Sequence, residues 1–523
     1  MRLGSRLLDH AATVFLVFLI IYLLSLTSNF TGPHDSMAYL KMLQSREHLW
    51  HPHHLLYHQL SYYWLHLLKY FFPMVENYFL VESFSSLFGA GTIAVSYLFF
   101  RKRFHLPVLT SWMGCGIIGF SYGVWFYSIN VEVYGPSLFF TLASLYQLTK
   151  REWDAQAVWL TAIFHSLAIL FHQMNILLTP IVLYKIVEQR KHIFVFKSIF
   201  WYGLTGIVLV GGTYFLAGRY GEGHADLSSW MEWVKGYTTT GEYWRPLSLK
   251  TPLLAGAGFT HAILGGHFVF KVGLERWVTS LLHTHSLQDE YFLVQHMSRE
   301  SGRLLLVLSI FLFVFISLLL IKFLLQLKWI TRNYFYVIIP LILYFLIYSI
   351  YFLFWMPEIL EFWIGQTVVF WLLIIGGHQS VNRRVNILLA GILILLTFIN
   401  YAGSILPMQN INNDIGYIRI QKVREQASGK DMVLVQNPWL LKEFLQYYTP
   451  AQVAQNPKSI QEADSLSQIV QTQLKNGNKV FIFINRNESI GNSNPDFLSK
   501  LIEQNKARAT LIQEKPAEVW LLK

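Results

Sequence analysis

Long apolar stretches separated by short polar gaps dominate the first 400 residues of the chain. A helix needs about 20 apolar residues to cross the hydrocarbon core of a bilayer, and about eleven stretches approach that length. A further apolar stretch, 252–272, is rich in glycine and carries two histidines, so we expect it to be re-entrant or interfacial rather than spanning. The predicted spans are 11–28, 77–100, 106–126, 133–149, 155–171, 173–188, 194–217, 303–327, 334–355, 362–380 and 385–402.

Basic residues fall in the short gaps between these stretches and predict their orientation, because cytoplasmic loops carry an excess of Lys and Arg. All the clusters lie on one side if the eleven stretches cross and 252–272 does not. This alternation predicts a cytoplasmic N-terminus, a non-cytoplasmic C-terminus and two outer loops, 29–76 and 218–302. The clusters are Arg2 and Arg6, Arg101–Arg103, Lys150 and Arg151, Arg190 and Lys191, Lys328 and Arg332, and Arg383 and Arg384.

The pattern changes after residue 404, where Gln, Asn and Lys become frequent. Short apolar runs then alternate with amphipathic segments, which is typical of a small α/β domain. The run 479–484 is almost continuously apolar, so we expect a central strand that is buried on both faces. We predict a transmembrane catalytic domain over 1–404 and a non-cytoplasmic α/β domain over 405–523. The other predicted strands are 431–436, 509–513 and 517–522, and the helices are 438–448, 458–475 and 494–505.

Composition agrees with a multi-pass integral membrane protein. The chain has 523 residues, of which 54% are hydrophobic and 14% are charged, whereas soluble domains carry about 25% charged residues. This excludes a disordered chain and an ordinary cytosolic enzyme. The net charge of +11 does not indicate nucleic acid as a partner, because the basic residues form short clusters and not one basic face. The single cysteine, Cys115, excludes an intramolecular disulfide.

The first outer loop places a carboxylate directly after the first predicted span. Gly32 and Pro33 end that span, and Asp35 follows at the expected membrane surface. Partial desolvation there can tune the pKa of a carboxylate for general-base catalysis. Alternatively, Asp35 simply caps the helix that begins at Ser36.

Histidines are concentrated in the same loop. His51, His54 and His58 share one helical face by spacing, which would suit a metal such as zinc. Neither a cysteine nor an HExxH pattern accompanies them, and Pro52 breaks the helix at its start. We therefore assign no metal ligand, and leave a divalent cation open as a cofactor. Otherwise the imidazoles are donors suited to a phosphate or a sugar, on a helix that lies in the membrane interface.

Two further outer turns carry polar residues beside predicted spans. Glu132 lies in the sequence VWFYSINVEVYGPS, and a carboxylate at this depth is costly unless it is paired or functional. The alternative is that Glu132 pairs with a nearby basic residue. His172 opens the turn between the fifth and sixth spans. Because the topology alternates, we predict that Asp35, Glu132 and His172 converge at one bilayer surface.

These residues resemble the GT-C superfold of membrane glycosyltransferases. The string HPHHLLY at 51–57 resembles the HPPGYPLY-type string of an uncharacterised membrane family allied to protein O-mannosyltransferases. Trp125 with Val131–Tyr134 resembles that family's W…EVY segment, and 171–180 resembles its H…LL…P segment. The resemblance covers about residues 1–190. The chain departs from the family at two points. HPHHLL stands where the family has HPPGYP, and Asp35 is followed by Ser36, whereas many GT-C members have two neighbouring acidic residues in this loop.

The resemblance implies a glycosyltransferase that takes a sugar from a polyprenyl-phosphate carrier, with inversion. It implies Asp35 as the general base and Glu132 as a second catalytic residue. The implied partners are the lipid-linked donor, a protein, lipid or glycan acceptor, and the bilayer. The implied location is the non-cytoplasmic face of a bacterial plasma membrane. Candidate substrate-binding residues are His34, His51, His53, His54, Tyr57 and His172, with Arg219, Lys235 and Arg245 in the long outer loop.

Two alternatives use the same class of lipid. A polysaccharide polymerase or ligase also takes a polyprenyl-linked donor on the outer face, and 218–302 partly shares the large arginine-containing loop of such proteins. A transporter of lipid-linked sugars would not cleave the donor. The chain has neither an inverted repeat nor charged residues in the middle of the predicted spans, which argues against a transporter.

Overall fold

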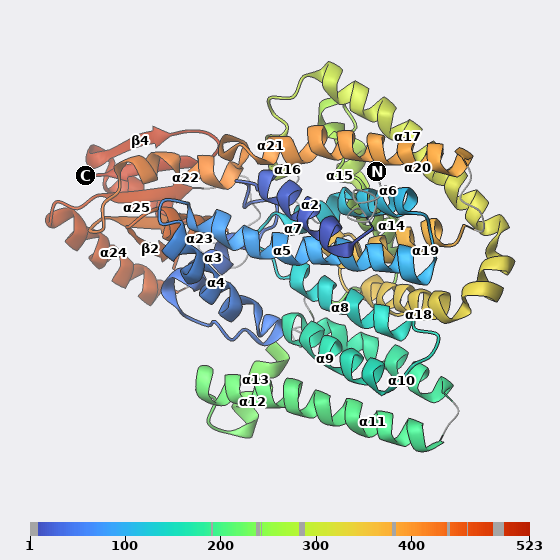
Figure 1. The fold of residues 1–523 in the computed structure, drawn as a ribbon. Helices are drawn as coiled ribbons and strands as arrows, with labels where there is room; N and C mark the ends of the chain where they lie inside the picture. The colour runs from blue at the N-terminus through green and yellow to red at the C-terminus, as the bar shows by residue number, and fades with distance from the viewer. Residues whose placement is uncertain are drawn as a thin grey trace. The chain divides into compact units, whose positions relative to one another are not determined.

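The computed structural model describes residues 9–189, 192–236, 241, 243–281, 288–378, 383–436, 440–457, 459–484 and 496–523. Two of the basic clusters, Arg2 with Arg6 and Arg190 with Lys191, lie outside these residues. The chain forms two compact units (Figure 1) that do not follow the order of the sequence. The first unit contains 1–27, 46–287 and 296–409, and the second contains 28–45, 288–295 and 410–523.

The first unit is helical, and each predicted span contains a helix. The span 106–126 is broken at Phe120 and Ser121 into two helices. Helix α5 packs against α2, α8, α4, α6 and α7. A Cβ atom at Gly89 would lie 2.1 Å from Ser128 Oγ, so glycine permits the close approach of α5 and α7. The helices in or near the predicted spans are α2 (Ala11–Leu24), α5 (Asn77–Leu98), α6 (Val108–Gly119), α7 (Tyr122–Ser128), α8 (Tyr134–Leu148), α9 (Ala155–Phe171), α10 (Thr179–Glu188), α11 (His192–Gly206), α12 (Gly212–Leu216), α17 (Arg299–Leu325), α18 (Leu327–Phe354), α19 (Ile364–Gly376) and α20 (Arg383–Asn400).

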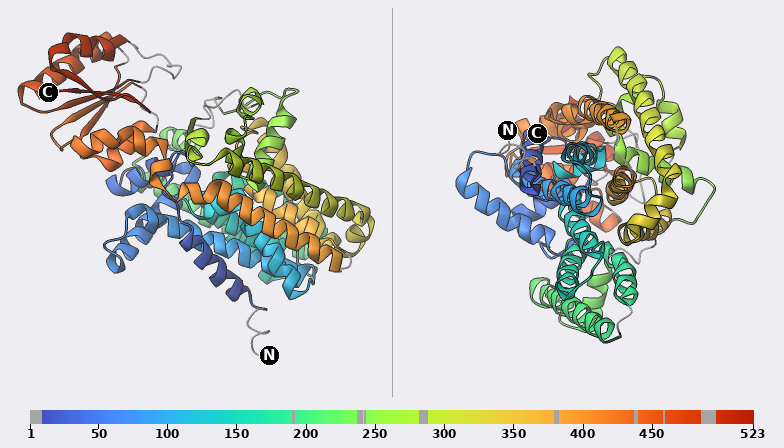
Figure 2. Two further views of the ribbon diagram at one scale, coloured as in Figure 1. Left: turned by 90° about the horizontal axis from the view of Figure 1, so that it is seen from above. Right: turned by 45° about the vertical axis from the view of Figure 1, so that its right-hand side comes forward.

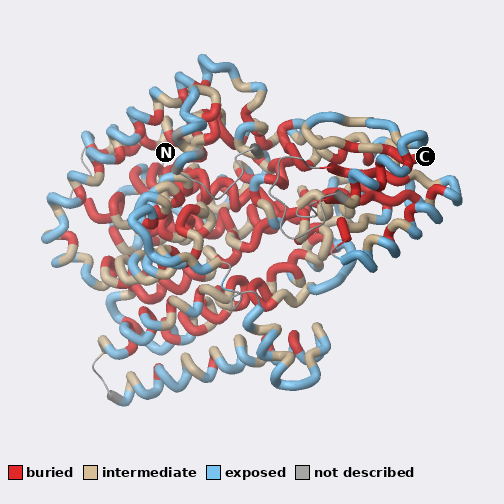
Figure 3. The backbone as a smooth tube through the Cα atoms, turned by 180° about the vertical axis from the view of Figure 1, so that it is seen from behind, coloured by how far each residue is buried: buried red, intermediate tan, exposed pale blue. Residues whose placement is uncertain are grey.

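Within the described residues, five helical stretches are long and apolar enough to cross a membrane. In the stretch 193–221, only 11% of the most apolar window is buried within the protein, and α11 is mostly exposed or half-buried along its length (Figure 3). Apolar helices with exposed faces need a lipid environment. The chain is therefore an integral membrane protein. The five stretches are Asn77–Arg103, Ile193–Gly221, Arg299–Leu325, Leu327–Phe354 and Arg383–Met408.

The longer segments between the predicted spans of this unit contain shorter helices. The stretch 252–272 folds as α14 (Thr251–Ile263), a break at Leu264–Gly266, and the 3-10 turn η7 (His267–Lys271). The first loop contains the 3-10 turn η1 (Pro52–His54) and α4 (Tyr57–Phe71), and the long loop contains α13 (Leu227–Lys235) and α15 (Glu275–Leu281).

The second unit contains a five-stranded mixed sheet in the order β2-β1-β3-β5-β4. Strand β1 pairs in parallel with β2 and β3, and β5 is antiparallel to β3 and β4. All five residues of β3 are buried and β3 is central, which confirms the prediction for 479–484. The strands are β1 (Met432–Val435), β2 (Gln452–Gln455), β3 (Val480–Ile484), β4 (Ala509–Gln513) and β5 (Glu518–Leu522).

Helices α24 (Ile460–Lys475) and α25 (Asp496–Gln504) cover one face of this sheet (Figure 2). Alternate strand residues such as Val480 and Ile482 face Val470 and Leu501 in one apolar cluster, as the period of two in a strand requires. The other helices of the unit are α3 (Ser36–Ser45), α16 (Gln288–Leu293), α22 (Ile415–Gln426) and α23 (Leu441–Tyr448). The predicted helix starts at 438, 458 and 494 lie outside the described residues.

Candidate active site

Asp35 lies in the second unit at the start of α3. Its carbonyl oxygen accepts the first helical hydrogen bond, from Tyr39 N at 3.0 Å, so Asp35 occupies the N-cap position. Within the described part of the chain, the one hydrogen bond that reaches its carboxylate comes from the Tyr39 hydroxyl, at 3.2 Å. The side chain therefore does not act as the cap. His34 precedes it in the left-handed region, with φ of 59°.

The carboxylate of Asp35 is more basic than an ordinary aspartate. It reaches the surface of its unit, yet the surrounding protein desolvates it and so raises its pKa. Repulsion from the Glu443 carboxylate on α23 raises the pKa further, while the Tyr39 hydrogen bond lowers it. A carboxylate with these neighbours accepts a proton more readily, as a general base requires.

Five imidazoles of the first unit form a histidine cluster, composed of His51, His53, His54, His58 and His172. The rings of His51 and His54 stack with centroids 5.4 Å apart, and the rings of His54 and His172 meet edge to face at 4.7 Å. The expectation that His51, His54 and His58 share one helical face was wrong, because His51 precedes the 3-10 turn that Pro52 begins and His58 lies in α4. That turn still brings the rings together.

Contacts between distant segments hold this turn in place. Leu56 N donates to Leu170 O at 3.0 Å, which ties the first loop to the end of α9, where His172 follows. The Tyr214 hydroxyl donates to Pro52 O at 2.6 Å. In the described residues, no group of three or more His, Cys, Asp or Glu side chains has an arrangement that could hold a metal ion.

Burial keeps the histidine cluster neutral. Desolvation lowers the pKa of His51 and His53 to about 4 and that of His172 to about 3. A neutral imidazole offers one N–H donor and one acceptor nitrogen, which suits hydrogen bonds to sugar hydroxyls or phosphate oxygens.

The histidine cluster predicts acid-sensitive stability. The unfolded imidazoles bind protons below pH 6.5, whereas the folded ones resist them until about pH 4, so stability is lost as the pH falls through this window. For His51 the loss approaches roughly 3 kcal/mol at the acid end. Melting temperature between pH 7.5 and 4.5 measures it. We expect a shallower dependence for His172→Gln and no change of slope for His66→Gln, an exposed ring on α4. An unaltered slope in His172→Gln would contradict this account.

Glu132 is buried in the turn between α7 and α8. Ser85 Oγ donates to its carbonyl oxygen at 3.3 Å, and the Glu132 charge contributes to a raised pKa of the buried Tyr57. Thr27 Oγ1 donates to Asn130 Oδ1 at 2.9 Å and fixes the same turn. The Glu132 turn and Tyr57 therefore lie together within the first unit.

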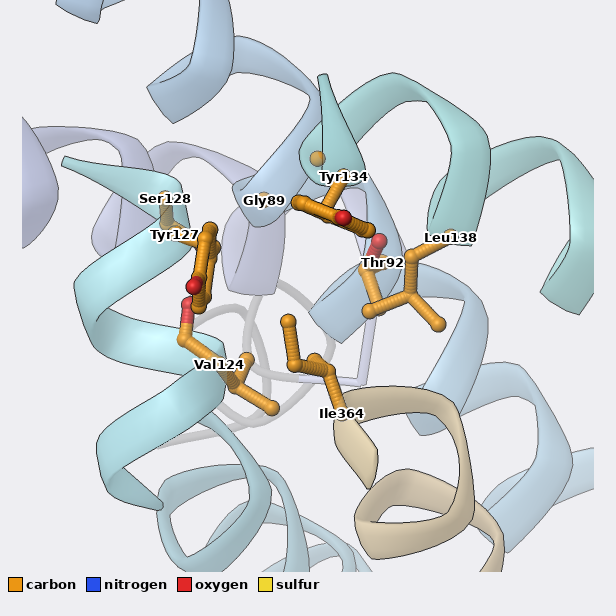
Figure 4. A pocket seen from close by; sticks show the side chains of 9 residues that line it. Gly89, Thr92, Val124, Tyr127, Ser128, Tyr134, Leu138 and Ile364 are labelled. Atoms are coloured by element: carbon orange, nitrogen blue, oxygen red, sulfur yellow. The ribbon is translucent and has the colours of Figure 1, made fainter. Parts of the chain in front are cut away.

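Tyr134 links this turn to the histidine cluster. Its ring lies 5.4 Å from that of His172 and 5.1 Å from that of Tyr127. Tyr127 and Tyr134 also line a cavity about the size of one water molecule (Figure 4). The predicted proximity of the Glu132 turn and His172 thus holds within the first unit. Convergence with Asp35, which belongs to the second unit, stays a prediction.

Glu361 is a site residue that the sequence reasoning missed. It accepts hydrogen bonds from the Tyr134 hydroxyl at 2.8 Å and from the Tyr127 hydroxyl at 3.1 Å. Glu361 precedes α19 in the gap that follows α18. The sequence could have indicated this residue. The predicted alternation of spans puts this gap on the outer side, and the gap carries two carboxylates, Glu358 and Glu361.

The three predicted basic residues have different surroundings. Arg245 forms an ion pair with Glu358, with Nη2 and Oε1 3.6 Å apart, and exposed Arg219 donates to Ala225 O. Lys235 is exposed at the end of α13. Its neighbour Gly236 has φ of 49°, and a Cβ atom there would lie 2.4 Å from His53 Nε2. Glycine at 236 therefore brings the end of α13 against the histidine cluster.

Comparison with known proteins identifies the fold. No family model and no curated protein matches the chain. Among solved structures, ArnT from Cupriavidus metallidurans in the apo state is similar with a TM-score of 0.59 and 10% identity, over 98% of this chain and 97% of that chain. This chain has the GT-C fold. The resemblance drawn from residues 1–190 is confirmed at the level of the fold, and the GT-C fold extends over nearly the whole chain.

Two further structures are similar at lower scores. ArnT from Cupriavidus metallidurans bound to undecaprenyl phosphate has a TM-score of 0.46 and 11% identity, over 98% of this chain and 97% of that chain. Arabinofuranosyltransferase AftD from Mycobacteria has a TM-score of 0.43 and 14% identity; the match covers 98% of this chain and 40% of AftD.

Proposed function

We propose that this chain is a membrane glycosyltransferase that moves a sugar from a polyprenyl-phosphate carrier to an acceptor at the non-cytoplasmic face. The similarity to apo ArnT over nearly the full length of both chains carries the proposal. ArnT has also been observed with undecaprenyl phosphate, which supports the class of carrier. The acceptor is a protein, a lipid or a glycan.

The reaction we propose is an inverting displacement at the anomeric carbon. The acceptor hydroxyl forms a new bond to that carbon while the bond from the carbon to the phosphate oxygen breaks, and polyprenyl phosphate leaves with the electron pair. Asp35 takes the proton of the hydroxyl. Its raised pKa and its carboxylate, which is not used as a helix cap, support this role.

The leaving phosphate requires hydrogen-bond donors and positive charge. We assign the donors to the histidine cluster and to Tyr57. Lys235 is the proposed cation, because Gly236 next to it lies against His53. Arg245 already pairs with Glu358 and Arg219 with Ala225 O, so we assign both to holding the long loop. Glu132 and His172 orient the substrate.

We further propose eleven crossings in a bacterial plasma membrane, with 252–272 on the outer side. In a Cys115→Ser background, an impermeant maleimide added to intact cells should label Ser229→Cys on α13 and Ser465→Cys on α24. Ser465 is exposed and Ser229 is half-buried. Asn333→Cys, in a gap predicted to be cytoplasmic, should react only after the cells are opened. Labelling of Ser229→Cys or Ser465→Cys only in opened cells would overturn the topology.

Turnover distinguishes the enzyme from a transporter. With a polyprenyl-phosphate-linked sugar and an acceptor source, a glycosyltransferase consumes the donor and releases polyprenyl phosphate. A transporter moves the donor across the bilayer and leaves it intact. Intact donor after transfer across the bilayer would overturn the proposed function.

A further inference from the structure

Asp414 is a fully buried carboxylate in the second unit, directly before α22. Its Oδ2 accepts hydrogen bonds from Phe30 N at 2.5 Å and Thr31 N at 3.1 Å. Its Oδ1 accepts from Thr31 Oγ1 at 2.5 Å and from Tyr417 N at 3.1 Å. Four donors therefore surround a side chain that has no access to solvent.

Capping α22 explains only one of these contacts. An N-cap needs one side-chain oxygen, which here accepts from Tyr417 N. The other three contacts go to residues 30 and 31, at a separation of more than 380 positions. Gly416 N in turn donates to Thr31 Oγ1 at 3.1 Å. The Thr31 hydroxyl therefore both donates to Asp414 and accepts from the first turn of α22. A buried carboxylate is costly without such bonds, and charge-assisted bonds are about twice as strong as neutral ones.

The residues that Asp414 holds lie just before Asp35. Gly32 N donates to Asn29 Oδ1 at 3.0 Å, and His34 N donates to Thr31 O at 3.3 Å. Pro33 has its φ fixed by its ring. Because these hydrogen bonds link the residues of 29–34 to one another, we expect a shift of Thr31 to move Asp35 as well.

The same part of the chain also contacts the helix that follows Asp35. Helix α23 packs against α3, and Phe444 of α23 lies against Gly416, where a Cβ atom would be 2.6 Å from its ring. Asp414 therefore fixes the segment on one side of Asp35, while α23 supports the helix on the other side.

We infer that Asp414 is a positioning residue for Asp35, through which the C-terminal region sets the place of the general base. The inference rests on the proposed function for the role of Asp35. It assigns the C-terminal region a part in catalysis, whereas the sequence predicted a catalytic domain confined to residues 1–404.

Asp414→Asn tests the inference in the full-length protein. Asparagine caps a helix about as well as aspartate, but its NH₂ group cannot accept from the N–H groups that Asp414 holds. We expect kcat to fall by about 10-fold to 100-fold, the scale of a misplaced reacting group, with KM for the lipid-linked donor unchanged. Hydrogen exchange of the peptide 28–35 should become faster. Asp154→Asn is the matched control, since Asp154 caps α9 through Ala157 N, and should keep the wild-type kcat.

A second pair of variants covers the case in which Asp414→Asn does not fold. Thr31→Val keeps the shape of the side chain but loses the hydroxyl, and should lower kcat, whereas Thr31→Ser should restore it. A wild-type kcat in Asp414→Asn or Thr31→Val, with Asp35→Asn inactive, would overturn the positioning role alone. An active Asp35→Asn would instead overturn the base assignment in the proposed function.

Discussion

Replacing Asp35 by asparagine is expected to abolish sugar transfer while the protein still folds and inserts. In the described residues its carboxylate accepts one hydrogen bond, from Tyr39, and an asparagine oxygen can accept the same bond. The substitution therefore removes the basic group with little change in packing. Loss of a general base lowers the rate by on the order of 10²-fold to 10⁴-fold. The rate of polyprenyl phosphate release, normalised to folded protein, measures the effect.

Glu443→Gln is the companion to this variant. The Glu443 carboxylate raises the pKa of Asp35, so its removal should lower that pKa and move the acid limb of the pH–rate profile to lower pH. Asp35 is active as a base when it is deprotonated, and activity should therefore persist further into acid. An Asp35→Asn protein that retains more than a tenth of the wild-type rate would rule out Asp35 as the base.

Glu361→Gln is expected to lower both the stability of the protein and the rate of sugar transfer. The carboxylate accepts from the hydroxyls of Tyr127 and Tyr134, and hydrogen bonds to a charged group contribute about 1.5–3 kcal/mol each. A glutamine offers one acceptor oxygen, so one tyrosine loses its partner. Since the Tyr134 ring contacts His172, we expect a stability loss of about 2 kcal/mol and a roughly 10-fold lower rate.

Variants of the two tyrosines distinguish an effect on the rate from an effect on protein stability. Tyr134→Phe should reproduce most of the rate loss, because it removes the hydroxyl that donates to Glu361 and so loosens the ring that contacts His172. Tyr127→Phe should lower the melting temperature with a smaller effect on rate. Equal rate losses in both variants would contradict a specific role for Tyr134 at the histidine cluster.

The helices and the central strand could be predicted because they depend on local pattern. An apolar run of about 20 residues folds as a helix in lipid, where backbone groups have no other partner, and the run 479–484 had to be buried. The break at Phe120 and Ser121 was missed, because no charged residue interrupts 106–126. Strand β2 was also missed. It has four residues, QVAQ, and its place depends on pairing with β1, which the local sequence does not reveal.

The histidine cluster could be predicted, because histidines are concentrated in the first loop of the sequence. The residues that contact the cluster and the Glu132 turn could not be predicted. Tyr134 and Glu361 are 227 positions apart, and Phe30 and Asp414 are 384 positions apart. Contacts at such separations depend on the packing of the whole fold. The grouping of residues 28–45 with the C-terminal residues was unforeseen for the same reason. A single domain boundary at 404 would instead have placed 28–45 with the membrane helices.

Donor turnover in proteoliposomes shows directly whether the protein transfers the sugar. The purified full-length protein receives polyprenyl-phosphate-linked sugars extracted from host membranes, together with an envelope fraction as the source of acceptor, and mass spectrometry follows both lipids. We expect the wild-type protein to convert the donor to an equal molar amount of polyprenyl phosphate, and Asp35→Asn to leave the donor intact. Donor that crosses the bilayer uncleaved would contradict the proposed function, and equal release of polyprenyl phosphate by Asp35→Asn would contradict the role of Asp35.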